Sequence, residues 1–320
     1  MHKPLSRRFS GYTYESMVND LHIFTRVFPQ FLYLDSLGKT GDNREIYHLV
    51  LGQEGAREKI FFFGGIHGRE YMTSQLLMEQ AAEFLTHFYK GKETYKGRTY
   101  EELLEGKAIH LVPMANPDGV AICQQGPVGI RDKELCNLVW KIGEQEGGRN
   151  PCGPYYKQWK ANARGVDLNR NFDALWEKYR DGKGGPAREG WKGNAPEDQE
   201  ESKALAELTR KERFSRTVSY HSSGSVIYWD FGQKGNFREV NLNFARRIEL
   251  VTGYERQDGW EDTDPAGYKD WAVMKMQIPS LTLEIGRLAS PLPPFCFREI
   301  LRENRGVWEE TLLDLEENSF

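Results

Sequence analysis

Two side chains that could bind a metal ion lie close together in the first quarter of the chain. The apolar run Ile60-Phe61-Phe62-Phe63 is followed by two glycines, and His67 and Glu70 come directly afterwards. Such a run predicts a buried strand, and a turn that opens into a helix would point both side chains at one centre. Nitrogen and oxygen donors suit zinc, and a catalytic zinc takes three protein ligands and leaves one position open. An isolated H-x-x-E pair is common on protein surfaces, so this interpretation requires a third ligand from elsewhere.

Two further polar residues follow apolar segments in the same way. His221 comes directly after the predicted strand 214–220, and the predicted strand 279–284 ends in the carboxylate of Glu284. Sites in α/β sheets usually form at the C-terminal ends of strands. Three of the four residues can bind zinc, and the remaining carboxylate can act as the base that takes a proton from an activated water. The arginines between residues 164 and 170 could supply the cation that stabilises a tetrahedral oxyanion.

The elements that must position these residues are predicted from periodicity and turn residues. No repeat, low-complexity segment or linker appears, so residues 1–320 are predicted to form a single domain. His48 and His110 fall in apolar strands and are interpreted as hydrogen-bonded histidines of the core or sheet edge. Helices are expected at 10–30 (with Ser10 as N-cap), 71–90, from about 196, 237–252, 268–275 and 295–315; strands at 31–37, 45–51, 108–113 and 226–229; a turn at 116–119; and irregular structure at 120–165 and 173–195.

Composition excludes several classes of function. The formal net charge is −4 and the basic residues are scattered, which does not favour nucleic-acid binding. No apolar run approaches the roughly 20 residues that span a bilayer. The first residues lack an apolar signal core, and the four cysteines form no C-x-x-C pair, so we expect a cytoplasmic protein with reduced thiols. The sequence makes no prediction of the oligomeric state.

Five segments of the chain combine glycines with polar or charged residues, or end an apolar strand in one. They are His67-Gly68-Arg69-Glu70, Asn116-Pro117-Asp118-Gly119, Gly165-Val166-Asp167-Leu168-Asn169-Arg170-Asn171-Phe172, Tyr220-His221-Ser222 and Thr282-Leu283-Glu284. In these segments and their order the chain resembles the zinc carboxypeptidase family, and the resemblance extends from about Tyr12 to the C-terminal helix. It implies a single α/β domain with a mixed, mostly parallel eight-stranded sheet and helices on both faces.

The resemblance also implies roles for individual residues. His67, Glu70 and His221 would bind one zinc ion per chain. Glu284 would be the general base and would later give its proton to the leaving amine. Asn169 and Arg170 would bind a carboxylate on the leaving side of the substrate, where a planar guanidinium favours a bidentate contact.

Two positions depart from the pancreatic-type pattern of this family. That pattern has its oxyanion arginine directly after a tryptophan, where this chain has Trp159-Lys160. Arg164 is the nearest guanidinium and is predicted to take that role, with Lys160 as the alternative. The family pattern also has a tyrosine in a flexible loop that closes over the substrate. At the corresponding position, counted back from Asp270-Trp271, this chain has Asp262. Tyr268 is the nearby candidate for this contact with substrate.

Within the family, the amino-acid sequence of residues 159–172 and 267–271 is most similar to that of bacterial γ-D-glutamyl-L-diamino acid endopeptidases. That similarity implies a peptide or muropeptide substrate cut at its γ-D-Glu–diaminopimelate bond. Lys269, just before the Asp-Trp pair, would favour a leaving residue with an extra carboxylate. The alternatives are an ordinary metallocarboxypeptidase, or a zinc amidase or deacylase of the aspartoacylase type. No G-x-S-x-G supports a serine hydrolase, and the complete ligand set argues against a non-catalytic binding module.

Overall fold

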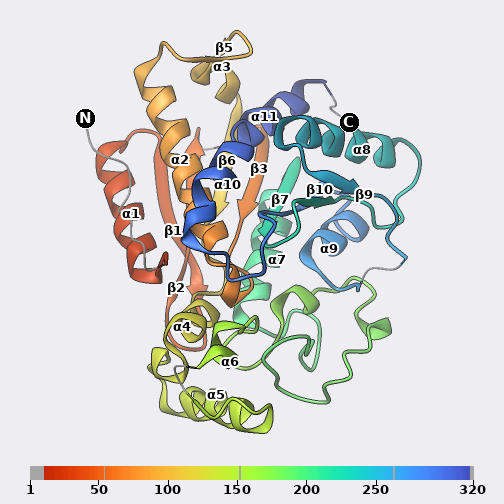
Figure 1. Cartoon of the computed structure of the whole chain (residues 1–320). Coiled ribbons are helices and arrows are strands. Elements are labelled where there is room, and N and C mark those ends of the chain that lie inside the picture. Colours follow the sequence, from red (N-terminus) through yellow and green to blue (C-terminus); the bar gives the residue numbers. More distant parts are fainter. Residues whose placement is uncertain (1–10, 54, 151–152, 262–263, 318–320) are drawn as a thin grey trace.

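A mixed sheet of eight strands forms the centre of the protein. The computed structural model describes residues 11–53, 55–150, 153–261 and 264–317. The strand order is β1-β2-β6-β3-β7-β10-β8-β9 (Figure 1). The pairs β6–β3, β3–β7, β7–β10 and β8–β9 are parallel, and the other three are antiparallel, so a mixed, mostly parallel sheet is confirmed. The strands are β1 (Leu32–Lys39), β2 (Glu45–Gly52), β3 (Glu58–Phe63), β6 (Lys107–Val112), β7 (Arg216–His221), β8 (Val226–Tyr228), β9 (Glu255–Gln257) and β10 (Ser280–Glu284), with a separate hairpin of β4 (Thr94–Tyr95) and β5 (Arg98–Thr99).

Both faces of the sheet are covered by helices, because its central strands are apolar on both sides. Side chains alternate along β3, so Phe62 packs into one core cluster while Phe61 and Phe63 pack into the other. Each ring that is removed from water in this way contributes about 1.5–3 kcal/mol. The helices are α1 (Tyr14–Val27), α2 (Met72–Lys90), α3 (Tyr100–Leu104), α8 (Gly235–Thr252), α10 (Phe297–Glu303) and α11 (Val307–Glu317) on the first face, and α7 (Glu200–Glu212) and α9 (Tyr268–Met274) on the second (Figure 1).

The segment 120–165 was predicted to be irregular, and this is wrong. It contains α4 (Pro117–Gln125), α5 (Lys133–Gln145) and the short α6 (Pro154–Lys157), which gather at one end of the sheet (Figure 1). Their apolar side chains form a third cluster around Trp159 and Tyr156. The predicted turn at 116–119 is the start of α4, because the Asn116 side chain accepts a hydrogen bond from the Gly119 N–H at 2.8 Å and caps that helix.

The remaining elements lie close to their predicted positions, with three differences. The first helix begins after Thr13, which caps it, and Ser10 lies outside the described residues. The helix expected from about 196 begins at Glu200. The last predicted helix is two helices, since Gly306 adopts a φ of +88° between α10 and α11. None of the described helices is both long and apolar enough to cross a membrane.

Candidate metal centre and active site

The turn after β3 delivers the first two candidate ligands. His67 directly precedes η1 (Gly68–Glu70), so its side chain and that of Glu70 emerge on the same side of this single turn. The turn packs tightly against α4, since a Cβ on Gly68 would lie 2.3 Å from the carbonyl oxygen of Gly119. Only glycine permits this approach of two backbones. Both ligand side chains are buried, with 4% of His67 and 2% of Glu70 exposed.

His221, the last residue of β7, completes a group of three donors. Nδ1 of His221 lies 3.2 Å from Nδ1 of His67 and 3.0 Å from Oε2 of Glu70, and the His67 Nδ1 lies 2.9 Å from Oε1 of Glu70. Bonds of about 2.0–2.1 Å to a tetrahedral zinc would hold such donors about 3.3 Å apart. Among the described residues, this is the one group of three or more His, Cys, Asp or Glu with ligand atoms this close. The spacing and the donor types therefore fit zinc.

Asp167 fixes the orientation of the His67 ring, a role that the sequence analysis did not assign to it. Its Oδ1 lies 3.1 Å from the other ring nitrogen, Nε2. A carboxylate only accepts, so Nε2 donates and a neutral His67 presents the lone pair of Nδ1 to the centre. Burial opposes a charge on His67, yet the negative charges of Glu70 and Asp167 raise its pKa. The negative charges of Glu70 and Asp167 thus favour a cation at this site.

Asn116 holds three segments together beneath these ligands. Besides capping α4, its Nδ2 donates to the carbonyl oxygen of Ile66 at 3.0 Å and to that of Ala161 at 3.1 Å. The side chain is fully buried. The Asn-Pro-Asp-Gly segment therefore supports the turn that carries His67, and we find it at the edge of the site.

Glu284 stands beside the donor group, at the end of β10. It pairs in register with His221 of the parallel neighbour β7. Burial, followed by the negative charge of Glu70, raises the pKa of Glu284 to about 8. A cation bound by Glu70 would oppose the second of these effects. Glu284 also lines two cavities, of about 280 and 330 Å³, and so stands where they meet.

Each of the two cavities is lined by an arginine and a lysine: Arg170 and Lys269 in the first, Arg69 and Lys160 in the second. Asn169 and Arg170 line the first, where Arg170 lies over the Tyr179 ring at 5.5 Å and contacts the exposed Asp264 at 3.6 Å. The Asn169 Oδ1 accepts the Tyr268 N–H at 3.0 Å, which leaves its amide Nδ2 as a donor. Lys160 lines the second cavity, together with Glu70 and Glu284.

Arg164 does not join this group. Its guanidinium pairs with Glu200 at 3.0 Å on the surface, where 45% of the Arg164 side chain is exposed. The chain from Trp159 onward brings Lys160 to the donor group instead, because the Lys160 carbonyl oxygen accepts the Gly68 N–H at 2.9 Å. Of the two cations weighed from the sequence, the structure places the alternative, Lys160, in the cavity.

Comparison with known proteins agrees with this geometry. A family model for zinc carboxypeptidases matches residues 17–310. The chain belongs to the zinc carboxypeptidase family. It is 30% identical to γ-D-glutamyl-L-diamino acid endopeptidase 1 of Lysinibacillus sphaericus over 303 residues, which are 93% of this chain and 71% of that protein. Human mast cell carboxypeptidase A is 23% identical over 230 residues, 70% of this chain and 48% of that protein.

Solved structures show the same fold. Thrombin activatable fibrinolysis inhibitor matches with a TM-score of 0.73 and 19% identity, covering 98% of this chain and 76% of that one. A carboxypeptidase A from Helicoverpa armigera matches with a TM-score of 0.65 and 18% identity. Membership of the family makes the chain a zinc metallopeptidase, and zinc is the metal that the family implies for the His67, Glu70 and His221 group.

The expectation that Tyr268 contacts the substrate is changed by the structure. Tyr268 is fully buried, its ring packs against Phe63 at 4.6 Å, and its hydroxyl lies 2.8 Å from Thr209 Oγ1. It therefore belongs to the core and does not take the role of the loop tyrosine in this structure, because α9 turns its ring inward. Asp262 lies outside the described residues. The tyrosine that does line the first cavity, beside Glu284, is Tyr228.

Lys269 lines the same cavity, as expected for a residue that contacts the leaving group. It is not a free cation, however. Its ammonium lies 2.6 Å from Oδ1 of Asp270, a residue that the sequence analysis used only as a landmark.

Proposed function

We propose that this zinc metallopeptidase hydrolyses the γ-D-Glu–diaminopimelate bond of peptidoglycan peptides. The observation that carries the proposal is the position of Glu284. It stands between the metal ligands and a cavity whose Arg170 and Asn169 can bind a carboxylate on the leaving residue. The bond proposed is supported by the similarity to an endopeptidase that is named for γ-D-glutamyl-L-diamino acids.

The chain's own residues provide most of the catalytic machinery. One zinc ion held by His67, Glu70 and His221 would lower the pKa of a water molecule to about 7 and polarise the substrate carbonyl. Glu284 accepts a proton from the attacking water and passes it to the nitrogen of the leaving residue. Burial, the larger cause of the raised pKa of Glu284, persists when a metal is bound and makes the carboxylate a stronger base than an exposed glutamate.

Cations on either side of Glu284 orient the substrate and stabilise charge. Arg170 and Asn169 bind the carboxylate of the leaving residue, so the scissile amide is held over Glu284. Lys160, in the second cavity, stabilises the oxyanion that develops on the carbonyl oxygen. This assigns to Lys160 the role predicted from the sequence for Arg164.

Hydrolysis of two peptides by the zinc-loaded protein tests this function, with Glu284→Gln as the control. The first peptide is L-Ala-γ-D-Glu-meso-diaminopimelate, and the second is an N-blocked dipeptide with a free C-terminal phenylalanine. We expect cleavage of the first at the γ-D-Glu bond, and loss of that cleavage in the variant. Cleavage of the second alone would make this an ordinary carboxypeptidase, and cleavage of neither would favour the deacylase alternative.

A further inference from the structure

The cavity on the leaving side of Glu284 contains a buried ion pair. Lys269 and Asp270 both line it, and their side chains are only 9% and 7% exposed. The ammonium and Oδ1 of the carboxylate are 2.6 Å apart. Removing two such charges from water is costly, and a buried pair is often no more stable than apolar residues of the same size. A pair retained at the wall of a substrate cavity therefore suggests a role in binding.

Neither charge is fully used by the hydrogen bonds of the described residues. Lys269 gives one N–H to Asp270 and one to the carbonyl oxygen of Asp230 at 2.9 Å. An ammonium has three donors, so one remains. Oδ2 of Asp270 accepts the Gly267 N–H at 3.2 Å, while a carboxylate offers about four acceptor positions. The pair can accommodate one more anion at Lys269 and one more cation at Asp270.

The surroundings hold the two groups in place. Asp270 is fixed by its bond to Gly267 at the start of α9, where it caps the helix. The Lys269 ammonium lies 5.2 Å from the centre of the Phe231 ring, which restricts it further. A preorganised pair of opposite charges matches a ligand that itself carries both charges on neighbouring atoms.

We propose that Lys269 and Asp270 together recognise an α-amino acid group at the far end of the leaving residue's side chain. This inference rests on the proposed function and adds to it a second point of recognition. Lys269 binds the distal carboxylate and Asp270 the distal ammonium, while Arg170 and Asn169 hold the near end of the residue. The leaving residue is then one that ends in both charges, as meso-diaminopimelate does. A lysine side chain would leave Lys269 without its partner.

Four peptides that differ only in the leaving residue test this inference. L-Ala-γ-D-Glu is followed by meso-diaminopimelate, by diaminopimelate with its distal carboxylate amidated, by L-lysine or by L-alanine. We expect kcat/KM for the first to exceed that for the amidated and lysine peptides by about 10- to 100-fold, because a hydrogen bond between charged partners is lost in both. Equal values for the four would overturn the inference and leave the proposed function standing. Cleavage of none would overturn the proposed function, and the inference with it.

The variants Lys269→Met and Asp270→Asn identify the residues responsible. Lys269→Met should reduce the preference for diaminopimelate over its amidated form to less than about threefold, mainly through a higher KM for the former. Asp270→Asn should reduce in the same way the preference for the lysine peptide over the alanine peptide, because lysine carries the distal ammonium alone. The ratio compares two substrates on one protein, so it is unaffected if part of a variant is misfolded. Lys275→Met is the matched control, since Lys275 lies at the C-terminal end of the same helix, α9, and pairs with Asp173 at the surface, at 2.8 Å. Survival of either preference in its own variant, or a loss shared equally by all four peptides, would overturn the inference.

Discussion

Two pairs of buried histidines lie in this sheet, and only one of them has the surroundings of a metal centre. The pair His67–His221 has its Nδ1 atoms 3.2 Å apart, and in the pair His48–His110 Nε2 and Nδ1 are 3.0 Å apart. All four rings are less than 7% exposed. Spacing and burial therefore do not distinguish the pairs.

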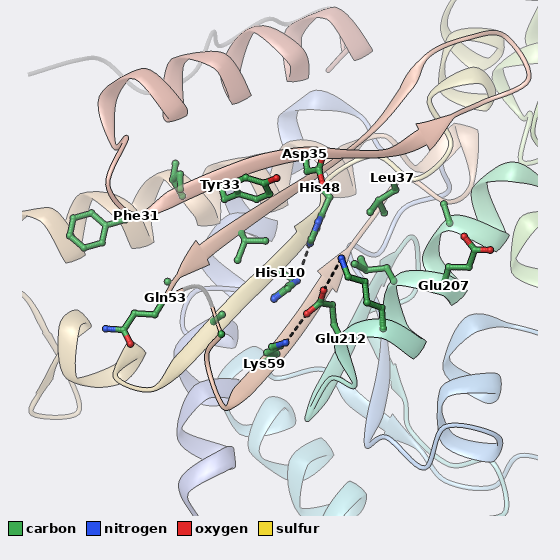
Figure 2. Close-up of a pocket in the computed structure, with 18 of the residues that line it drawn as sticks. Phe31, Tyr33, Asp35, Leu37, His48, Gln53, Lys59, His110, Glu207 and Glu212 are labelled. Carbon is green, nitrogen blue, oxygen red and sulfur yellow. Dashed lines mark hydrogen bonds and ion pairs between the residues drawn. The ribbon is translucent and has the colours of Figure 1, made fainter.

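The carboxylates around each pair make the difference. Glu70 contacts both rings of the first pair. The second pair faces a cavity of about 610 Å³ in which Glu212 is turned to Lys59, at 2.7 Å (Figure 2). Burial lowers the pKa of His48 to about 4. Burial, followed by the neighbouring His48, lowers the pKa of His110 to about 3. The second pair is thus two neutral rings that share one hydrogen bond, as interpreted from the sequence.

The comparison also shows that size does not identify the active site. The cavity beside His48 and His110 is about twice as large as either of the two that meet at Glu284. Both of its lysines, Lys59 and Lys211, pair with Glu212, whereas the smaller cavities bring a base, metal ligands and cations to one point. Converging charges, rather than volume, are what the chemistry requires.

The largest effect should come from removing the anion that the first pair has and the second lacks. Glu70→Gln keeps the shape of the side chain but loses its negative charge, so we expect zinc content to fall from about one per chain to less than about a tenth, and hydrolysis to be lost. Metal analysis after dialysis measures this. In the double variant His48→Gln/His110→Gln, zinc content should remain that of the native protein. Retention of zinc by Glu70→Gln would show that the carboxylate is not what separates the two pairs.

The next effect concerns the cation beside the metal centre. Lys160→Met should lower kcat by about 10²- to 10³-fold, the loss found when one oxyanion donor is removed. Zinc content should be unchanged, since Lys160 is not a ligand. Arg164→Met is the matched control and should stay within about twofold, because an exposed pair such as Arg164–Glu200 contributes little. The reverse pattern in steady-state kinetics would return the oxyanion role to Arg164.

The sequence was sufficient to predict the elements that depend on short runs of neighbouring residues. The β3 strand and the position of His67 follow from Phe61–Phe63 and the glycines after it, and the helix 72–90 follows from its apolar spacing. The signal for α5 was also present, in Leu135, Val139 and Ile142 at helical intervals, but the surrounding Gly and Asn obscured it. The Asn-Pro-Asp-Gly segment was misinterpreted because the same residues favour turns and helix starts.

The parts that could not be predicted depend on the direction of a side chain in three dimensions. Lys160 and Arg164 are four residues apart, and only the folded structure shows that Lys160 lines the cavity while Arg164 pairs with Glu200 at the surface. Tyr268 and Lys269 are neighbours on α9, yet one enters the core and the other lines the cavity. Asp167 was present in a quoted motif, and the general need of a ligand histidine for a carboxylate could have identified it.

A smaller effect should follow from loosening His67 without removing a ligand. Asp167→Asn replaces the acceptor for the Nε2 proton with a weaker one, so zinc affinity should fall by about 10- to 100-fold. Competition with a chelator of known affinity measures the dissociation constant. Glu212→Gln is the control, because this carboxylate lies near the second histidine pair and contacts Lys59. If both substitutions weaken zinc binding equally, the contact between Asp167 and His67 is not responsible.

Substitution of the second pair, His48 and His110, should change the stability of the protein rather than its activity. The folded pKa values of His48 and His110, about 4 and about 3, lie below the ordinary value of about 6.5. Between these values the unfolded chain binds more protons on these two residues, so their contribution to the free energy of unfolding should fall as pH decreases from about 6.5 towards 4, and stay level above 6.5. A pKa shift of this size lowers the free energy of unfolding by about 3 kcal/mol at pH 4 for one such ring. Urea unfolding at a series of pH values should show a flatter slope for His48→Phe/His110→Phe, and an unaltered slope for His22→Gln, which removes an exposed imidazole from α1. His67 and His221 are present in the native protein and in both variants, so their effect cancels when the slopes are compared. If the double variant has the same slope as the native protein, the buried pair does not titrate as its surroundings require.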